Sequence, residues 1–157
     1  MENANRIYRD PRYAALLTRL NDLEKERVYC KHDLDHFLSV GRIAYILSLE
    51  EGLSVSKDVL YTAALLHDIG RVEEITSGMA HAEASAKIAE LFLVNSTFTK
   101  DEKETVLSLI RSHRTHGKDS LTELFYRADK LSRPCAYCTA IASCHWKEDK
   151  KNRTLYY

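Results

Sequence analysis

His67 and Asp68 are adjacent residues whose side chains are both suited to binding a metal ion. They follow the apolar run Ala63–Leu66, which indicates the buried end of a helix, and Gly70 comes two residues later. We expect Gly70 to end that helix in the left-handed conformation, which glycine adopts cheaply. Unpaired carbonyls at a helix end favour a cation. Imidazole with carboxylate suits zinc, iron, manganese or nickel better than calcium. A buried His–Asp hydrogen bond without metal is the alternative.

Two more candidate ligands are predicted to face the interior from other helices. His36 lies one turn before Val40 on an apolar helical stripe, and Asp129 lies one turn after Phe125 on another. A carboxylate on an apolar face is costly unless something pairs with it. A metal would meet that need, although an arginine or a helix cap would also do so. For His36 the alternative is a hydrogen-bonded core histidine.

The helices needed to position these residues can be predicted from apolar spacing. The chain has five Gly, two Pro and no alternating strand-like runs, which predicts a mostly helical fold. Asp10–Pro11 and Ser54–Asp58 carry helix-start chemistry. We expect a polar loop over 71–80 that forms a pocket wall and offers Glu73 or Glu74 as a proton acceptor. Helices are expected over about 11–28, 33–51 and 56–68, from 81, from 100 to about 113, and over 120–131.

Composition limits the classes of function. At 157 residues the chain fits one domain with a sizeable core. Its 23 basic and 23 acidic residues balance without long runs, which argues against binding a nucleic acid polymer or a membrane surface. No apolar stretch approaches the roughly 18 residues of a membrane span. The polar start, residues 1–11, lacks a secretory signal, so we expect a cytoplasmic protein. No feature indicates an oligomeric state.

Taken together, His36, His67, Asp68 and Asp129 form a candidate ligand set drawn from separate helices. Three or four protein ligands leave coordination positions open for water and substrate, as catalysis requires. The bound ion would activate water and polarise a phosphoryl oxygen.

The order and spacing of these residues resemble the HD superfamily of metal-dependent phosphohydrolases. Segments 35–44, 63–71 and 126–131 match its first histidine, its His-Asp pair and its final aspartate, and the resemblance covers about residues 28–133. It implies an all-α, single-domain helical bundle in which the four ligands hold a divalent ion. We therefore expect an HD-type domain over 1–133 and an irregular cysteine-bearing tail over 134–157, packed on the same domain.

Two further segments, 81–86 and 110–117, resemble the bacterial HD proteins that split dinucleoside polyphosphates symmetrically. This resemblance implies that His81 and His113 bind a second ion. Arg114 departs from the pattern, because many two-metal members have histidine or threonine there. With a single ion, His81, His113 and Arg114 would face the substrate phosphates instead.

The four cysteines suggest a second metal site. Cys135, Cys138 and Cys144 have ligand-like spacing, and Cys30 would approach them if His36 and Asp129 share an ion. The expected occupant is structural zinc or an iron–sulfur cluster. His145 is the substitute ligand if Cys30 is too distant. The alternative is four reduced thiols, as suits a cytosolic chain.

These observations predict a metal-dependent phosphohydrolase acting on a nucleotide or another small phosphorylated metabolite. The cofactor would be one or two divalent ions of Fe, Mn, Ni, Zn or Co, with Asp68 also steering the water. Arg71, Arg114 and Lys130 are the basic residues expected around the phosphate. Two alternatives stay open. One is an HD-type di-iron oxygenase using His81 and His113, and the other is a redox or metal sensor using the cysteines.

Overall fold

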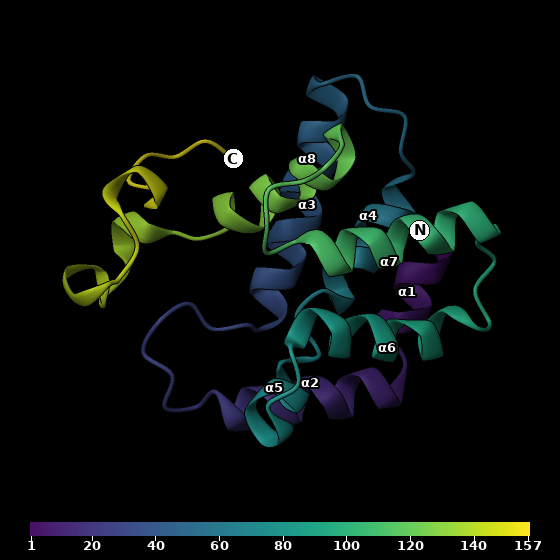
Figure 1. Cartoon of the computed structure of the whole chain (residues 1–157), viewed down its shortest axis with the longest axis horizontal. Helices are drawn as coiled ribbons and strands as arrows, with labels where there is room; N and C mark the ends of the chain where they lie inside the picture. Colours follow the sequence, from purple (N-terminus) through teal and green to yellow (C-terminus); the bar gives the residue numbers. More distant parts are fainter.

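The computed structural model describes all 157 residues and contains helices but no strands (Figure 1). The all-α, single-domain prediction is therefore confirmed, and no helix is long and apolar enough to cross a membrane. The α-helices are α1 (Glu2–Tyr8), α2 (Pro11–Leu23), α3 (Leu34–Glu50), α4 (Lys57–Leu66), α5 (Arg71–Ser77), α6 (His81–Leu93), α7 (Lys100–Ser112) and α8 (Ser120–Leu131).

Helix α4 forms the centre of the domain. Residues on nearly all of its faces are buried, which is typical of a helix enclosed by other helices. It packs against α3, α7 and α1, while α8 covers α3 and α6 pairs with α7. Tyr13 of α2 donates a buried hydrogen bond from its hydroxyl to the carbonyl of Leu65, 3.0 Å away. The end of α4, where the metal-ligand candidates follow, is thus held from several sides.

Side-chain caps set where the surrounding helices begin. Asp33 accepts a hydrogen bond from the backbone N–H of His36 at 2.9 Å, which starts α3 so that His36 lies in its first turn. Asp10 and Ser56 cap α2 and α4 in the same way. Thr99 and Asp119 form capping boxes at α7 and α8. The helix starts expected at Pro11 and near Ser56, Thr99 and Ser120 are confirmed.

The polar start of the chain forms α1, where Asp58 accepts hydrogen bonds from the backbone N–H groups of Asn3 and Ala4. Two local predictions were wrong. The segment expected to be a loop over 71–80 contains α5, which ends at left-handed Gly78. Helix α2 stops at Leu23 rather than near residue 28.

Gly70 is required for close approach rather than for left-handed geometry, so that expectation was also wrong. Its φ is −71°, and its backbone N–H donates to the Ser85 hydroxyl at 2.9 Å. A Cβ atom at this position would lie 2.2 Å from the backbone nitrogen of Ser85 and 2.6 Å from the carbonyl oxygen of His81. The glycine therefore lets α6 begin against the turn that carries Asp68.

After α8 the chain leaves the helical bundle as a tail over residues 134–157, yellow-green to yellow in Figure 1. Its only regular elements are three single turns of 3-10 helix, at Cys135–Tyr137, Ile141–Ser143 and Glu148–Lys150. Asn152 holds the tail near α8 by donating to the carbonyls of Lys130 and Arg133 at 2.6 and 3.0 Å. Tyr29 donates from its hydroxyl to the Ser143 carbonyl at 3.0 Å.

Gly70→Ala should displace the start of α6 and destabilise the domain. Overpacking against rigid backbone costs about 1–3 kcal/mol, which corresponds to a fall in melting temperature of roughly 2–12 °C. Gly52→Ala is the matched control, because Gly52 has a φ of 66° but nothing within 4 Å of the added Cβ. Both variants should melt earlier by calorimetry, but only Gly70→Ala should weaken metal binding near His81. Unchanged metal affinity in Gly70→Ala would contradict this account.

Candidate metal centre

His67 and Asp68 lie in the turn between α4 and α5. Helix α4 ends at Leu66, and α5 begins at Arg71, directly after Gly70. Both side chains are buried, with 0% of the surface of His67 and 2% of that of Asp68 exposed. A tight turn at the end of the most enclosed helix therefore presents both groups to the interior.

The first cluster contains His36, His67, Asp68 and Asp129, whose ligand atoms all lie within 4.8 Å of one another. Asp68 Oδ2 is 3.2 Å from His67 Nε2 and 3.7 Å from His36 Nε2. Asp129 Oδ1 is 3.4 Å from His36 Nε2. Four residues from the α3 start, the α4–α5 turn and α8 thus converge on one point.

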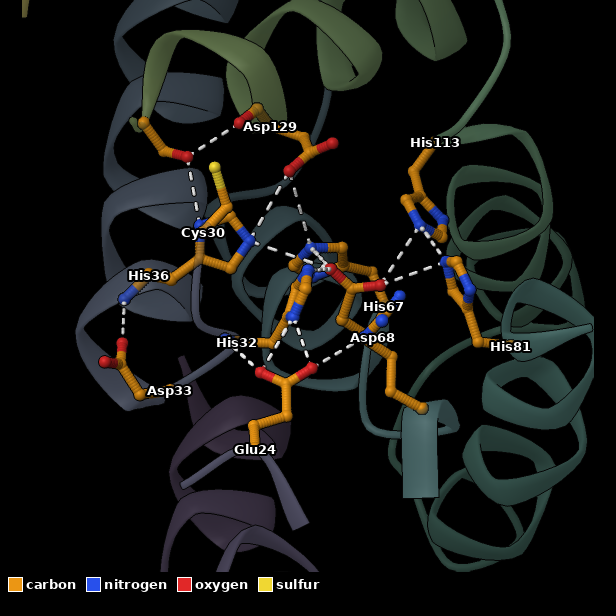
Figure 2. Close-up of polar contacts among 12 residues, drawn as sticks. Glu24, Cys30, His32, Asp33, His36, His67, Asp68, His81, His113 and Asp129 are labelled. Atoms are coloured by element: carbon orange, nitrogen blue, oxygen red, sulfur yellow. Dashed lines mark hydrogen bonds and ion pairs between the residues drawn. The ribbon is translucent and has the colours of Figure 1, made fainter. Parts of the chain in front are cut away.

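The second cluster uses the other oxygen of the same carboxylate. Asp68 Oδ1 lies 3.2 Å from His81 Nε2 and 3.3 Å from His113 Nε2, and the two nitrogens are 3.2 Å apart. His81 is the first residue of α6, and His113 directly follows α7. Figure 2 shows Asp68 between the two clusters, with His81 and His113 on one side and His36 on the other.

Each of these imidazoles is oriented through its Nδ1 atom. Nδ1 of His67 lies 2.7 Å from the carbonyl of Ala64, and Nδ1 of His113 lies 2.6 Å from that of Ile110. A carbonyl only accepts, so each Nδ1 carries a hydrogen, and in the neutral ring Nε2 then carries a lone pair. His81 and His36 follow the same rule through Glu74 (2.9 Å) and the Ser132 hydroxyl (3.1 Å), the latter donating to the Asp129 carbonyl. A neutral histidine whose Nε2 lone pair is free can coordinate a metal ion.

Buried polar atoms without hydrogen-bond partners test whether a cation fits. Nε2 of His36, Nε2 of His67 and Oδ1 of Asp68 are buried and have no hydrogen-bond partner. An unpaired buried polar group costs about 1–3 kcal/mol, more when it is charged. Lone pairs facing each other at these distances repel unless a positive charge lies between them. The donor set therefore fits a divalent metal ion.

The pKa shifts agree with a centre that attracts positive charge. Burial alone would raise the pKa of Asp68, but the neighbouring imidazoles of His67, His113 and His36 hold it well below its ordinary value. Burial lowers the pKa of His36 and of His81, which keeps both rings neutral. Burial also acts to lower the pKa of His67, but the charges of Asp68 and Asp129 outweigh it and the net shift is upward.

Two residues of the centre, Glu24 and His32, were missed from the sequence. Glu24 directly follows α2, is 3% exposed, and holds Nδ1 of His32 at 2.8 Å. Nε2 of His32 points to Asp68 Oδ2 at 3.6 Å (Figure 2). The four-residue spacing of His32 and His36, and a glutamate one residue beyond Leu23, were the available signals.

The three basic residues expected at the phosphate all line one cavity beside the metal clusters. Arg71 is held between two carboxylates, with Nε 2.9 Å from Glu24 and one terminal nitrogen 3.0 Å from Glu74. Lys130 is ion-paired with Asp129. Arg114 is exposed and forms no ion pair, so its charge is the most available to a substrate.

The cavity has a volume of about 150 Å³ and combines groups from both clusters with the tail. Arg27 and Arg133 also line it, and neither was predicted. Arg133 lies 3.3 Å from Asp129 and stacks over the ring of Trp146, with 5.3 Å to the ring centroid. The tail contributes Cys144, His145 and Trp146 to the wall. Such a basic pocket beside paired carboxylates suits an anion that can bridge to a metal.

The four cysteines are free thiols, and none belongs to either cluster of converged ligand atoms. Cys30 borders the cavity shared with Cys144 and also a second cavity that Cys135 and Cys138 line. Cys135 is buried and the other three are partly exposed. The zinc or iron–sulfur site at these residues stays a prediction.

Elemental analysis of protein purified without chelator should distinguish the metal bound at the first cluster from the metal bound at the second. His113→Ala should lower the metal content and leave the first cluster loaded, whereas Asp68→Ala should empty both because its carboxylate serves both. Cys135→Ser serves as the reference for any thiolate-bound metal. Equal metal content in Asp68→Ala and wild type would contradict this assignment of the ligands.

Glu24 should make the domain sensitive to acid. Burial alone would raise its pKa, but hydrogen bonds from His32 and Arg71 lower it from 4.5 to about 2. The resulting stability is complete above pH 4.5 and is lost as pH falls toward 2, by up to about 3 kcal/mol. The free energy of unfolding, measured with urea, should therefore be lower at pH 3 than at pH 6. This decrease should be about 2 kcal/mol smaller in Glu24→Gln than in wild type. Exposed Glu26→Gln is the control, and an unchanged pH dependence in Glu24→Gln would contradict the prediction.

Comparison with known proteins places the chain in a family. Residues 33–133 match the HD domain, and this range includes both metal clusters but neither His32 nor Glu24. An uncharacterized protein of Clostridium beijerinckii is 41% identical over 157 residues, which is the full length of both chains. Ribonuclease Y of Pseudothermotoga lettingae is 30% identical over 103 residues, 66% of this chain but only 18% of that protein.

A solved structure shares the fold. The crystal structure of a predicted HD superfamily hydrolase from an uncultured Thermotogales bacterium is similar with a TM-score of 0.63 and 27% identity, and the match covers 93% of this chain and 84% of that one. The family match over most of the helical domain, with the His-Asp pair at its centre, leads to one conclusion. The chain belongs to the HD domain family.

Proposed function

We propose that this protein is a metal-dependent phosphohydrolase that acts on a nucleotide or another small phosphorylated metabolite. The observation that carries the proposal is the position of Asp68, whose two carboxylate oxygens face two separate sets of imidazole nitrogens. Two ions about 3.5–4 Å apart on one carboxylate form a common hydrolytic arrangement for phosphate esters. The predicted hydrolase of the same fold and the HD domain match support this class of reaction.

Each residue has a proposed role in that reaction. His36, His67, Asp68 and Asp129 would hold one divalent ion, and Asp68, His81 and His113 would hold the second. When bound, such ions supply an activated water and polarise the phosphoryl oxygen. Asp68 steers that water because its carboxylate reaches both clusters. Glu74 holds the ring of His81 in place through Nδ1.

The cavity indicates how the substrate would bind. Its volume of about 150 Å³ accepts a phosphate group but not a whole nucleotide, so the rest of the substrate would lie outside. Arg114 is the free cation at the wall, while Lys130 and Arg71 are tied to carboxylates that a bound phosphate could replace. Charge-assisted hydrogen bonds from a few local cations suffice for a small anion in a neutral chain.

Within this class, a dinucleoside polyphosphate is the substrate that the sequence resemblance favours. The segments around His81 and His113 resemble the symmetrically cleaving bacterial HD proteins, and both histidines join Asp68 in the second cluster. A symmetric attack on diadenosine tetraphosphate would release two molecules of ADP as the only nucleotide product. ADP as the sole product would support this substrate class.

An RNA phosphodiester is the second candidate substrate. It is favoured by the 30% identity to ribonuclease Y of Pseudothermotoga lettingae over 103 residues. A 5′-labelled oligoribonucleotide assayed beside the small phosphates would separate the two candidates. Release of labelled fragments without hydrolysis of any small phosphate would favour the nuclease.

Asp68→Asn should abolish hydrolysis in manganese- or iron-loaded protein, because the amide cannot hold two cations. Arg114→Ala should raise KM roughly 10- to 100-fold with little change in kcat, since a hydrogen bond to a charged group is worth about 1.5–3 kcal/mol. Arg111→Ala is the matched control, because Arg111 is an exposed arginine in the last turn of α7 that pairs with Glu83 and Glu90 outside the cavity. Full activity in Asp68→Asn would contradict the proposed function.

A further inference from the structure

His32 is the imidazole at the centre that belongs to neither metal cluster. It lies just before α3, is 5% exposed, and lines the same cavity as Asp68, His81 and His113. Buried histidines need partners for both ring nitrogens. The two partners of His32 are therefore informative about its role.

Glu24 fixes the ring of His32 on one side. Its Oε1 and Oε2 atoms lie 2.8 and 3.0 Å from Nδ1 of His32, and Oε2 also accepts the backbone N–H of His32 at 2.9 Å. Oε1 accepts a further hydrogen bond from Arg71 at 2.9 Å. A carboxylate that already accepts from Arg71 is ionised, so it requires a hydrogen on Nδ1 of His32. With the hydrogen on Nδ1, the neutral form of the ring presents a lone pair at Nε2.

The other side of the ring faces Asp68. Nε2 of His32 is 3.6 Å from Asp68 Oδ2, which is too long for a direct hydrogen bond. Both atoms are acceptors in this arrangement, so neither can satisfy the other. The species that fits between two acceptors is a donor such as water, and the cavity of about 150 Å³ has room for it.

Comparison with His81 supports this interpretation. Glu74 holds Nδ1 of His81 as Glu24 holds Nδ1 of His32, and both Nε2 atoms point at Asp68. The Nε2 atom of His81, however, lies within 4.8 Å of both other atoms of its cluster, as a metal ligand must. His32 has the orientation of a ligand, but its Nε2 atom lies outside both groups of converged ligand atoms.

We propose that His32 accepts a hydrogen bond from the water bound beside Asp68 Oδ2 and orients that water toward the phosphorus atom, with Glu24 as its positioning residue. The inference rests on the proposed function and adds to it the group that aims the water. Glu24 also holds Arg71, so one buried carboxylate would align both the water and a phosphate-facing cation.

The test compares His32→Asn, Glu24→Gln and Glu24→Asp in manganese-loaded protein. His32→Asn should lower kcat about 100-fold with KM and metal content unchanged, as expected when a group acts on the water alone. Glu24→Gln should lower kcat and also raise KM, because it releases both His32 and Arg71. Glu24→Asp should recover part of the kcat. Exposed Glu26→Gln is the control and should behave as wild type.

Two results would overturn the inference. Unchanged kcat in His32→Asn would show that His32 does not orient the water, and loss of a metal ion in that variant would make His32 a ligand instead.

If wild-type protein hydrolyses none of the phosphates, the proposed function fails. Nitrogen-15 NMR of the zinc-loaded protein then still tests whether Glu24 fixes the ring of His32. The expected spectrum shows His32 with hydrogen on Nδ1 and a metal-free Nε2, and this tautomer preference is lost in Glu24→Gln. A hydrogen or a metal at Nε2 would contradict the assignment.

Discussion

The buried carboxylate of Asp68 is the constraint on which the rest of the structure depends. It is 2% exposed, it lies among five imidazole rings, and one of its oxygens has no hydrogen-bond partner. Such an arrangement is unfavourable without positive charge, because the lone pairs of the rings and the carboxylate face one another. The fold therefore pre-organises a site for cations at some cost to its own stability, as functional sites commonly do.

The helices around this carboxylate serve mainly to hold ring orientations. His67 and His113 follow α4 and α7 directly, and each ring is fixed by a carbonyl of the helix that it follows. His81 opens α6 instead and is fixed by Glu74. Close packing at Gly70 brings the start of α6 against the Asp68 turn. Helix ends and helix starts thus direct the Nε2 atoms of these histidines toward Asp68.

Much of this could be predicted from the sequence because the signals are local. Apolar periodicity and caps such as Asp10 and Thr99 gave the main helices, and family spacing brought out His36, His67, Asp68 and Asp129. Gly70 was misinterpreted, because a glycine needed for helix contact looks the same in sequence as one that ends a helix. Glu24 and His32 were missed for a related reason, since their partnership with Asp68 exists only after α2 folds back onto α5.

The position of metal ions relative to Asp68 is the most direct test of the account. Crystals of manganese-loaded protein, measured at the manganese absorption edge, would locate each ion by anomalous scattering. The account predicts two peaks, one on each side of the Asp68 carboxylate, with His36, His67 and Asp129 at one and His81 and His113 at the other. Density for metal only among the cysteines, with none within bonding distance of Asp68, would contradict it.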